Sequence, residues 1–151
     1  MSEYRLYGFA QSGNSYKAAL MLALNNADWE PVFVDFHNGG TRTPEYRAVN
    51  EMGEAPVLEH GETRLSQSGA ILDYLSRRFR DFAPQSEADR LEVLRWTLWD
   101  NHKLTGYIAT LRYFLQFAKG PDPGAVAFLK GRMTGALGIL DWYTVLVGVF
   151  A

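Results

Sequence analysis

The chain has 151 residues and a mass of 17.0 kDa, the size of one ordinary domain or of two small ones. Apolar residues make up 47% and charged residues 21%, which argues against a disordered or fibrous protein. The first 84 residues carry 8 lysines and arginines against 11 acids, a net charge of −3, and the rest carries 7 against 6, a net charge of +1. Because neither part is strongly basic, we expect no nucleic-acid partner. The absence of cysteine excludes disulfides and cysteine nucleophiles on this chain, and with only 3 histidines we expect no metal site.

Two apolar runs are candidates for a leader or a membrane segment. Residues 18–24 follow a polar stretch and a strand-like segment, unlike the core of a signal peptide. Residues 142–151 make up about half the length that a membrane span needs. We therefore expect a soluble, cytoplasmic protein with no membrane partner.

The first half of the chain predicts a βαβ unit. The apolar pattern over residues 3–9 is typical of a short buried strand. Helical spacing of the apolar residues up to Leu24 predicts a helix, for which Ser12 or Asn14 is the candidate cap. The β-branched and aromatic run over residues 29–36 predicts a second strand, parallel to the first.

A hairpin and a closing helix follow this unit. Residues 56–59 and 63–65 flank a glycine turn and predict two short antiparallel strands. Residues 67–80 carry an apolar stripe at helical spacing, with Ser66 or Ser68 at the capping position. The predicted order is βαβ-ββα.

The remainder of the chain predicts helices only. One long helix over residues 86–119, bent at Gly106, is followed by a turn rich in proline and glycine over residues 120–124. A further helix is expected over residues 125–141. The apolar and partly β-prone residues 142–151 form a tail.

Ser12 lies where the first strand leads into the first helix. Unpaired backbone N–H groups and the positive end of the helix dipole favour an anion at this position, and Gly13 lets a ligand approach the backbone closely. Ser12 therefore either stabilises a thiolate or phosphate, or only caps the helix. No glycine-rich nucleotide-binding motif accompanies it.

Two other places have a similar choice of roles. Ala55-Pro56 begins a strand, where proline is either an ordinary trans residue or a cis residue that turns the backbone of Ala55 toward a ligand. Gln67-Ser68 opens the closing helix and either binds an anion or caps it. In the predicted fold both places and Ser12 fall at one edge of the sheet, so a single extended ligand with a carboxylate could touch all three.

Aromatic residues are frequent in the helical half. They either line an apolar substrate pocket or belong to the core or a subunit contact. They are Trp96, Trp99, Tyr107, Tyr113, Phe114 and Phe117.

Three blocks of the sequence, in this order and spacing, resemble the glutathione transferase family. They are residues 12–15 (SGNS), 50–58 (NEMGEAPVL) and 65–75 (LSQSGAILDYL). The resemblance implies an α/β fold, in which residues 1–80 form a thioredoxin-like glutathione-binding domain with a cis-proline. Residues 87–151 would then form part of an all-α domain, and the chain resembles one whose C-terminal domain is truncated.

The resemblance also assigns roles to individual residues. Ser12 matches the serine that donates a hydrogen bond to the glutathione sulfur in the serine-type cytosolic classes. Ala55 and Pro56 match the pair that binds the cysteinyl backbone, and Gln67 and Ser68 match the pair that holds the γ-glutamyl carboxylate. The electrophile would rest against aromatic residues of the long helix, such as Tyr107 and Phe114.

The implied function is that of a transferase with glutathione as co-substrate and no metal. It would conjugate glutathione to a small apolar electrophile, or use it to reduce one, as in detoxification, and it would act as a homodimer. The alternative is a related binding or scaffold module without turnover. Two mild departures from the family pattern are Glu51, in place of the usual proline, and Ala55, in place of a branched residue.

Overall fold

The computed structural model describes residues 2–80 and 82–146, and the chain divides into two compact units, Met1–Ser86 and Glu87–Ala151. The first unit holds one mixed sheet with the strand order β2-β1-β3-β4. Its strands are β1 (Tyr4–Gly8), β2 (Trp29–Phe33), β3 (Val57–His60) and β4 (Thr63–Ser66). Strand β1 runs parallel to β2 and antiparallel to β3, which pairs with β4 as a hairpin. The predicted order βαβ-ββα is confirmed.

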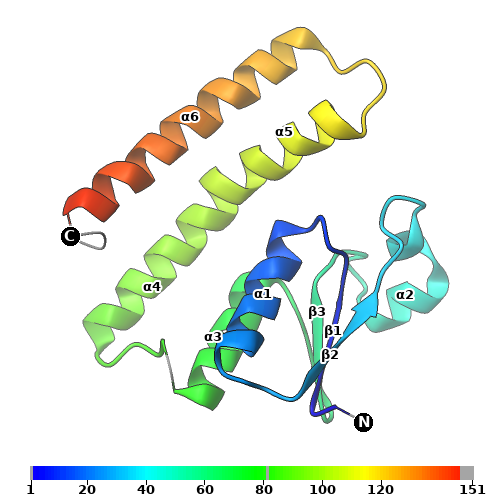
Figure 1. Cartoon of the computed structure of the whole chain (residues 1–151), viewed down its shortest axis with the longest axis vertical. Coiled ribbons are helices and arrows are strands. Elements are labelled where there is room, and N and C mark those ends of the chain that lie inside the picture. The colour runs from blue at the N-terminus through cyan, green and yellow to red at the C-terminus, as the bar shows by residue number, and fades with distance from the viewer. Residues whose placement is uncertain (1, 81, 147–151) are drawn as a thin grey trace. The chain divides into compact units, whose positions relative to one another are not determined.

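Helices cover both faces of this sheet, as Figure 1 shows. Helices α1 (Gly13–Leu24) and α3 (Ser68–Phe79) lie on one face, and the short helix α2 (Pro44–Val49) lies on the other, after a 3-10 turn over Gly40–Arg42. The core between the sheet and helices α1 and α3 consists of Tyr4, Leu6, Ala18, Met21, Leu22, Leu58, Ile71 and Leu75. A smaller cluster of Val34, Tyr46 and Val57 lies on the face of α2.

Two boundaries in this unit differ from the prediction. Strand β2 ends at Phe33 and not at residue 36, because β1 ends at Gly8 and residues 34–39 fold into tight hydrogen-bonded turns. Helix α3 is capped neither by Ser66 nor by Ser68. Its N-cap is Gln67, with a positive φ of 66° and no capping hydrogen bond from its side chain.

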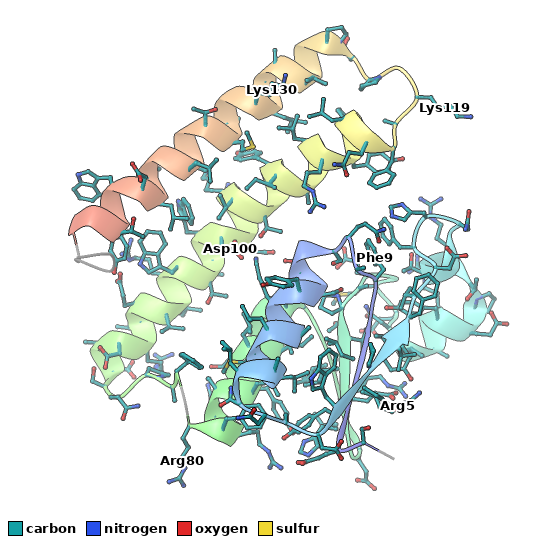
Figure 2. The ribbon with its side chains drawn as sticks, in the orientation of Figure 1. Arg5, Phe9, Arg80, Asp100, Lys119 and Lys130 are labelled. Carbon is teal, nitrogen blue, oxygen red and sulfur yellow. The ribbon has the colours of Figure 1, made fainter. Side chains whose placement is uncertain are left out.

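The second unit consists of a long interrupted helix and its antiparallel neighbour. Helix α4 (Glu87–Trp99) passes through a π-helical segment (Asp100–Thr105) into α5 (Gly106–Gln116), and α6 (Pro123–Leu146) runs back alongside (Figure 1). Figure 2 labels Asp100 where α4 ends. The predicted bend at Gly106 is replaced by this segment, in which Thr105 Oγ1 donates to Asp100 Oδ1 over 2.9 Å, five residues back.

Helix α6 is longer than the sequence pattern predicts. It begins at Pro123, where Asp122 Oδ1 accepts a hydrogen bond from the Ala125 amide, and it runs through residues expected to form a tail. Tyr143 explains this extension, because its ring lies 4.4 Å from that of Trp96 on α4. The rest of that tail, residues 147–151, lies outside the described residues. None of the helices described here has the length and apolar character that a bilayer crossing requires.

Candidate functional site

Three of the predicted site segments leave the sheet at the same edge. In the strand register Tyr7 lies opposite Val57, and Val57 lies opposite Ser66. The chain beyond β1 leads to Ser12, the chain before β3 contains Pro56, and the chain after β4 continues into Gln67. The sheet therefore brings these segments together, although they are far apart in the sequence.

Ser12 is the N-cap of α1. Its Oγ accepts a hydrogen bond from the Ser15 amide over 3.1 Å, and its own amide donates to the carbonyl of Phe9. Figure 2 labels Phe9 in the turn after β1. The cap uses an acceptor position of the hydroxyl and leaves its O–H available as a donor. The two roles expected for Ser12, capping and anion binding, are therefore compatible.

Ser15 packs where α1 lies closest to β1. Its side chain is buried, and its Oγ has no hydrogen-bond partner in the described part of the chain. A Cβ at Gly8 would lie 2.6 Å from this oxygen, so only glycine fits at the end of β1. The close contact fixes the start of α1 against the sheet.

The N-termini of α1 and α3 meet through their side chains. Ser68 Oγ donates to Asn14 Oδ1 over 3.2 Å, across 54 positions of sequence. Two sets of unpaired backbone N–H groups therefore lie close together, an arrangement that favours anionic groups of a ligand. Asn14 is a contact that the sequence did not reveal, because its partner is decided by the tertiary fold.

The turn before β3 is held by buried side chains of α2 and its C-cap. The Ala55–Pro56 peptide bond is cis. Tyr46 Oη and Asn50 Nδ2 both donate to the carbonyl of Glu54, over 2.9 and 2.8 Å. The main chain just ahead of Ala55 is thus fixed by two hydrogen bonds from residues that are themselves buried.

The side chain of Glu54 reaches the start of α3. Gln67 Nε2 donates to Glu54 Oε2 over 2.8 Å, and the same amide lies 3.4 Å from Met52 Sδ. Contacts therefore connect the turn at Ala55 with Gln67, and Ser68 with Asn14. Glu54 was not among the predicted site residues, and only its position next to Ala55 could have suggested it.

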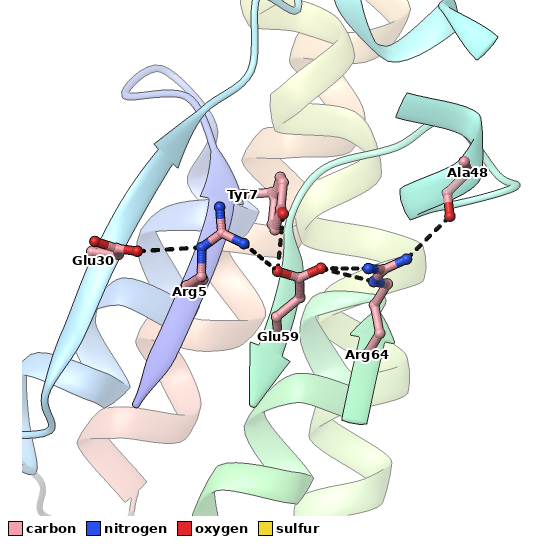
Figure 3. Close-up of polar contacts among 6 residues, drawn as sticks. All are labelled: Arg5, Tyr7, Glu30, Ala48, Glu59 and Arg64. Atoms are coloured by element: carbon pink, nitrogen blue, oxygen red, sulfur yellow. Dashed lines mark hydrogen bonds and ion pairs between the residues drawn. The ribbon is translucent and has the colours of Figure 1, made fainter. Parts of the chain in front are cut away.

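On the sheet face that α2 covers, a row of charged side chains connects the four strands with one another and with α2 (Figure 3). Arg5 lies between Glu30 on β2 and Glu59 on β3, at 3.3 and 2.9 Å, and Glu59 also accepts from Arg64 on β4. Arg64 Nη1 donates in addition to the Ala48 carbonyl, near the end of α2, over 3.1 Å. Opposite charges on neighbouring strands stabilise the sheet, and the last contact anchors α2 to it.

Two tyrosines on this face stay neutral well above physiological pH. Burial raises the pKa of Tyr46 to about 12, so its hydroxyl remains a donor to Glu54. Burial and the hydrogen bond to Glu59, 2.9 Å long, raise the pKa of Tyr7. Both groups have a structural part in holding the edge of the sheet.

His37 lies in the loop after β2. Its ring packs at 5.6 Å from that of Phe9 and 5.7 Å from that of Phe36, which itself stacks on Phe9 at 4.6 Å.

No group of metal-ligating side chains suited to hold an ion is present among residues 2–80 and 82–146.

The two residues expected to meet the electrophile belong to the second unit. Tyr107 lines a cavity of about 290 Å³ between the π-helical segment, α5 and α6. Its hydroxyl accepts from Arg132 Nη2 over 2.9 Å, a contact that lowers the pKa of Tyr107. Phe114 packs near Tyr113, with the ring centres 6.3 Å apart. The part of these residues in electrophile binding stays a prediction.

Comparison with known proteins identifies relatives of the chain. Protein URE2 from Debaryomyces hansenii is 25% identical over 147 residues, which cover 91% of this chain and 48% of that protein. Glutathione S-transferase 1 from Dianthus caryophyllus is 36% identical over 75 residues, which cover 50% of this chain and 34% of that protein. The chain therefore spans about half or less of the length of these curated relatives.

Solved structures of glutathione S-transferases are also similar to this chain. The crystal structure of a possible glutathione S-transferase from Rhodopseudomonas palustris superposes with a TM-score of 0.86 at 36% identity, covering 94% of this chain and 65% of that one. A theta class glutathione S-transferase from Xanthomonas axonopodis pv. citri, with glutathione bound, gives 0.88 at 26% identity, covering 96% and 72%.

The family of the chain is shown by a match to the first unit, which contains the sheet edge described above. Residues 2–77, half of the chain, match the family described as Glutathione S-transferase, N-terminal domain. The fold, a thioredoxin-like unit followed by helices, agrees with that match. The chain therefore belongs to the glutathione S-transferase family.

Proposed function

We propose that the chain binds glutathione along the edge formed by Ser12, the Ala55–Pro56 turn and the start of α3. Ser12 then stabilises the thiolate of the ligand for attack on a small apolar electrophile. Membership of the family supports this proposal, as does the bound glutathione in the structure from Xanthomonas axonopodis. The observation that carries it is the Ser68–Asn14 hydrogen bond, because it unites the N-termini of α1 and α3.

Each segment of the edge takes one part of the tripeptide. The main chain of Ala55 pairs with the cysteinyl backbone. The free backbone amides in the first turn of α3 donate to the γ-glutamyl carboxylate, as does the Ser68 hydroxyl once its O–H turns from Asn14 to the ligand, and the side-chain amide of Gln67 lies beside them. This leaves the sulfur next to the Ser12 hydroxyl.

The chemical benefit lies in the ionisation of the thiol. A free thiol has a pKa of about 8.5, so only a few per cent of it is ionised at neutral pH. Lowering that pKa by about two units corresponds to roughly 2.7 kcal/mol in favour of the thiolate. A hydrogen bond from Ser12 and the positive end of α1 both act in this direction.

The reaction then needs no covalent bond to the protein. The thiol proton leaves to solvent, and the thiolate sulfur donates an electron pair to an electrophilic carbon. A carbon–sulfur bond forms while a leaving group departs with its own electron pair, or while a conjugated double bond accepts the pair and then a proton. Ser12 acts as a donor to the sulfur throughout, and the chain's lack of cysteine fits a nucleophile supplied by the ligand.

Replacing Ser12 tests this function directly. In Ser12→Ala we expect conjugation of a chromogenic aryl halide at pH 6.5 to fall by roughly 10- to 100-fold in kcat/KM, with the affinity for glutathione little changed. The deficit should shrink above about pH 8.5, where the thiol ionises unaided. Ser12→Thr, which keeps the hydroxyl, should restore activity.

Ser15→Ala is the matched control, because it removes a buried hydroxyl three residues away that contacts no polar partner in the described part of the chain. Equal rates for wild type and Ser12→Ala would assign Ser12 to capping alone. Retention of the wild type on a glutathione resin without any turnover would favour a binding module. A wild type that is not retained would contradict the proposal as a whole.

A further inference from the structure

We infer that Met52 is a modification site: a peroxide converts its thioether to the sulfoxide, and the added oxygen becomes the acceptor of the Gln67 side-chain amide. The inference goes beyond the proposed function and does not depend on it, because both groups belong to the chain itself. It makes the edge of the sheet at the start of α3 sensitive to oxidants.

The first argument is exposure. The chain has 4 methionines and no cysteine, so methionine carries its sulfur-based redox chemistry. The side chain of Met52 is 51% exposed, whereas that of Met21 is 8% exposed and that of Met133 is half-buried. Among the methionines that the structure describes, a dissolved peroxide therefore reaches Met52 most easily.

The second argument is the surroundings of the sulfur. Gln67 Nε2 lies 3.4 Å from Met52 Sδ, and Ser66 Oγ lies 3.9 Å from it. A thioether sulfur is only a weak acceptor, but conversion to the sulfoxide makes the side chain polar. Two hydrogen-bond donors are therefore already in place beside the atom that gains the oxygen.

The third argument is space. An N–H···O hydrogen bond alone takes about 2.9 Å, so the distance of 3.4 Å leaves no room for an oxygen between the sulfur and the Gln67 nitrogen. The Met52 amide donates over 3.2 Å to Oδ1 of Asn50, which is 2% exposed, so the main chain of Met52 is held in place. The added oxygen therefore displaces the Gln67 amide, which also donates to Glu54 Oε2 over 2.8 Å.

The modification is a two-electron oxidation by hydrogen peroxide. The Met52 sulfur gives an electron pair to one peroxide oxygen, and the sulfur–oxygen bond forms while the oxygen–oxygen bond breaks. The other oxygen leaves as water with both protons of the peroxide. The sulfur is oxidised, the peroxide is reduced, and no further reactant is needed.

The test first maps the oxidation along the chain. The folded protein is treated with a small excess of hydrogen peroxide, and peptide mass spectrometry follows the oxygen gained by each methionine with time. We expect Met52 to react at least roughly sixfold faster than Met21, in line with their exposed fractions of 51% and 8%. Equal rates for Met52, Met21 and Met133 would overturn the inference.

The second readout is the side-chain amide of Gln67 in proton–nitrogen NMR spectra, recognised as the signal that is missing in Gln67→Ala. In the oxidised wild type one amide proton of Gln67 should move downfield, because a hydrogen bond to oxygen replaces one to sulfur. Methionine sulfoxide reductases, one for each epimer, with dithiothreitol as reductant, should restore the original signal. A Gln67 signal that stays in place while Met52 is oxidised contradicts the inference.

Two variants serve as controls. Met52→Leu removes the sulfur and nearly keeps the volume of the side chain, so its Gln67 signal should not move after peroxide treatment. Met133→Leu, the matched control in the second unit, should respond like the wild type, and thermal melts should show all variants folded. A Gln67 shift that persists in oxidised Met52→Leu assigns the change to another residue and overturns the inference. None of these readouts uses glutathione, so their outcome is separate from that of the proposed function.

Discussion

The two units bury their apolar side chains to very different extents. In the first unit eight residues from the sheet and two helices form a closed core. In the described part of the second unit only Leu111, Leu129 and Ala136 are buried, whereas Leu98 is 61% and Trp142 64% exposed. Two layers around a sheet can enclose a core, but two antiparallel helical rods bury only one line of side chains.

The polar contacts differ in the same way. In the first unit they join residues far apart in sequence, such as Tyr7 with Glu59 and Ser68 with Asn14. Many of those in the second unit lie within one helix, such as the pair of Glu87 with Arg90. The comparison indicates that long-range packing specifies the first unit, while local helix formation contributes more to the second.

Truncating a core residue of the first unit should have the largest effect on the free energy of unfolding, and an exposed residue of the second unit serves for comparison. Leu75 is completely buried, so Leu75→Ala should lower the free energy of unfolding by about 2–5 kcal/mol. Leu98→Ala, at an exposed position, should change it by less than about 1 kcal/mol. Urea unfolding followed by circular dichroism measures both. Similar losses for the two variants would mean that Leu98 is covered in solution.

Removing a buried hydroxyl in the first unit should have an intermediate effect on the free energy of unfolding. Tyr46→Phe removes one of two hydrogen bonds to the Glu54 carbonyl and should cost roughly 0.5–1.5 kcal/mol at pH 8. Because the pKa of Tyr46 is raised to about 12 in the folded chain, its contribution is complete below pH 10 and declines between pH 10 and about 12. The difference between wild type and variant should therefore narrow in that range. A difference independent of pH would mean that the phenol is hydrated.

The smallest effect on stability is expected for the tie between α4 and α6, by which we mean the set of contacts made by the Glu92 carboxylate. Glu92 accepts from Trp96 Nε1 over 2.7 Å and from Tyr143 Oη over 3.3 Å, and it pairs with Arg95. The hydrogen bond from Arg95, followed by the weaker one from Trp96, lowers the pKa of Glu92 to about 2. Its contribution to stability is therefore present above about pH 4.5 and is lost as the pH falls toward 2.

Acid titration of Glu92→Gln tests this tie. The variant should be slightly less stable than the wild type at pH 7, and the two should converge near pH 2; salt should reduce the difference. Glu87→Gln, whose carboxylate pairs only within α4 among the described contacts, is the control and should lose less. Equal losses in the two variants would mean that Tyr143 adds nothing to the tie.

Much of the fold could be predicted from the sequence, because periodic apolar residues report local structure. The strand pattern before Gly8 and the apolar stripe ending at Phe79 both led to the correct elements. Boundaries were less accessible, since β2 ends where its partner strand ends and α3 begins after a residue with positive φ. The π-helical segment was missed, because i→i+5 pairing leaves no simple apolar period.

The site was only partly accessible for the same reason. Ser12 and Ser68 stand out because small polar residues precede or open helices. Asn14 was expected only as an alternative cap, and Glu54 was not expected at all, because their contacts with Ser68 and Gln67 form only after β1, β3 and β4 have paired. The assignment of Ser12 to a thiolate came from the family resemblance, and the fold adds the geometry that makes it testable.

The π-helical segment over Asp100–Thr105 has a consequence for how the long helix tolerates changes in length. Wider turns of this kind hold surplus backbone, so deleting one residue there can be absorbed by a return to ordinary α-helical pairing. The same deletion in the middle of α4 would rotate everything beyond it by about 100° and turn its apolar stripe away from its neighbour. A deletion of one residue should therefore be tolerated better within Asp100–Thr105 than in the middle of α4.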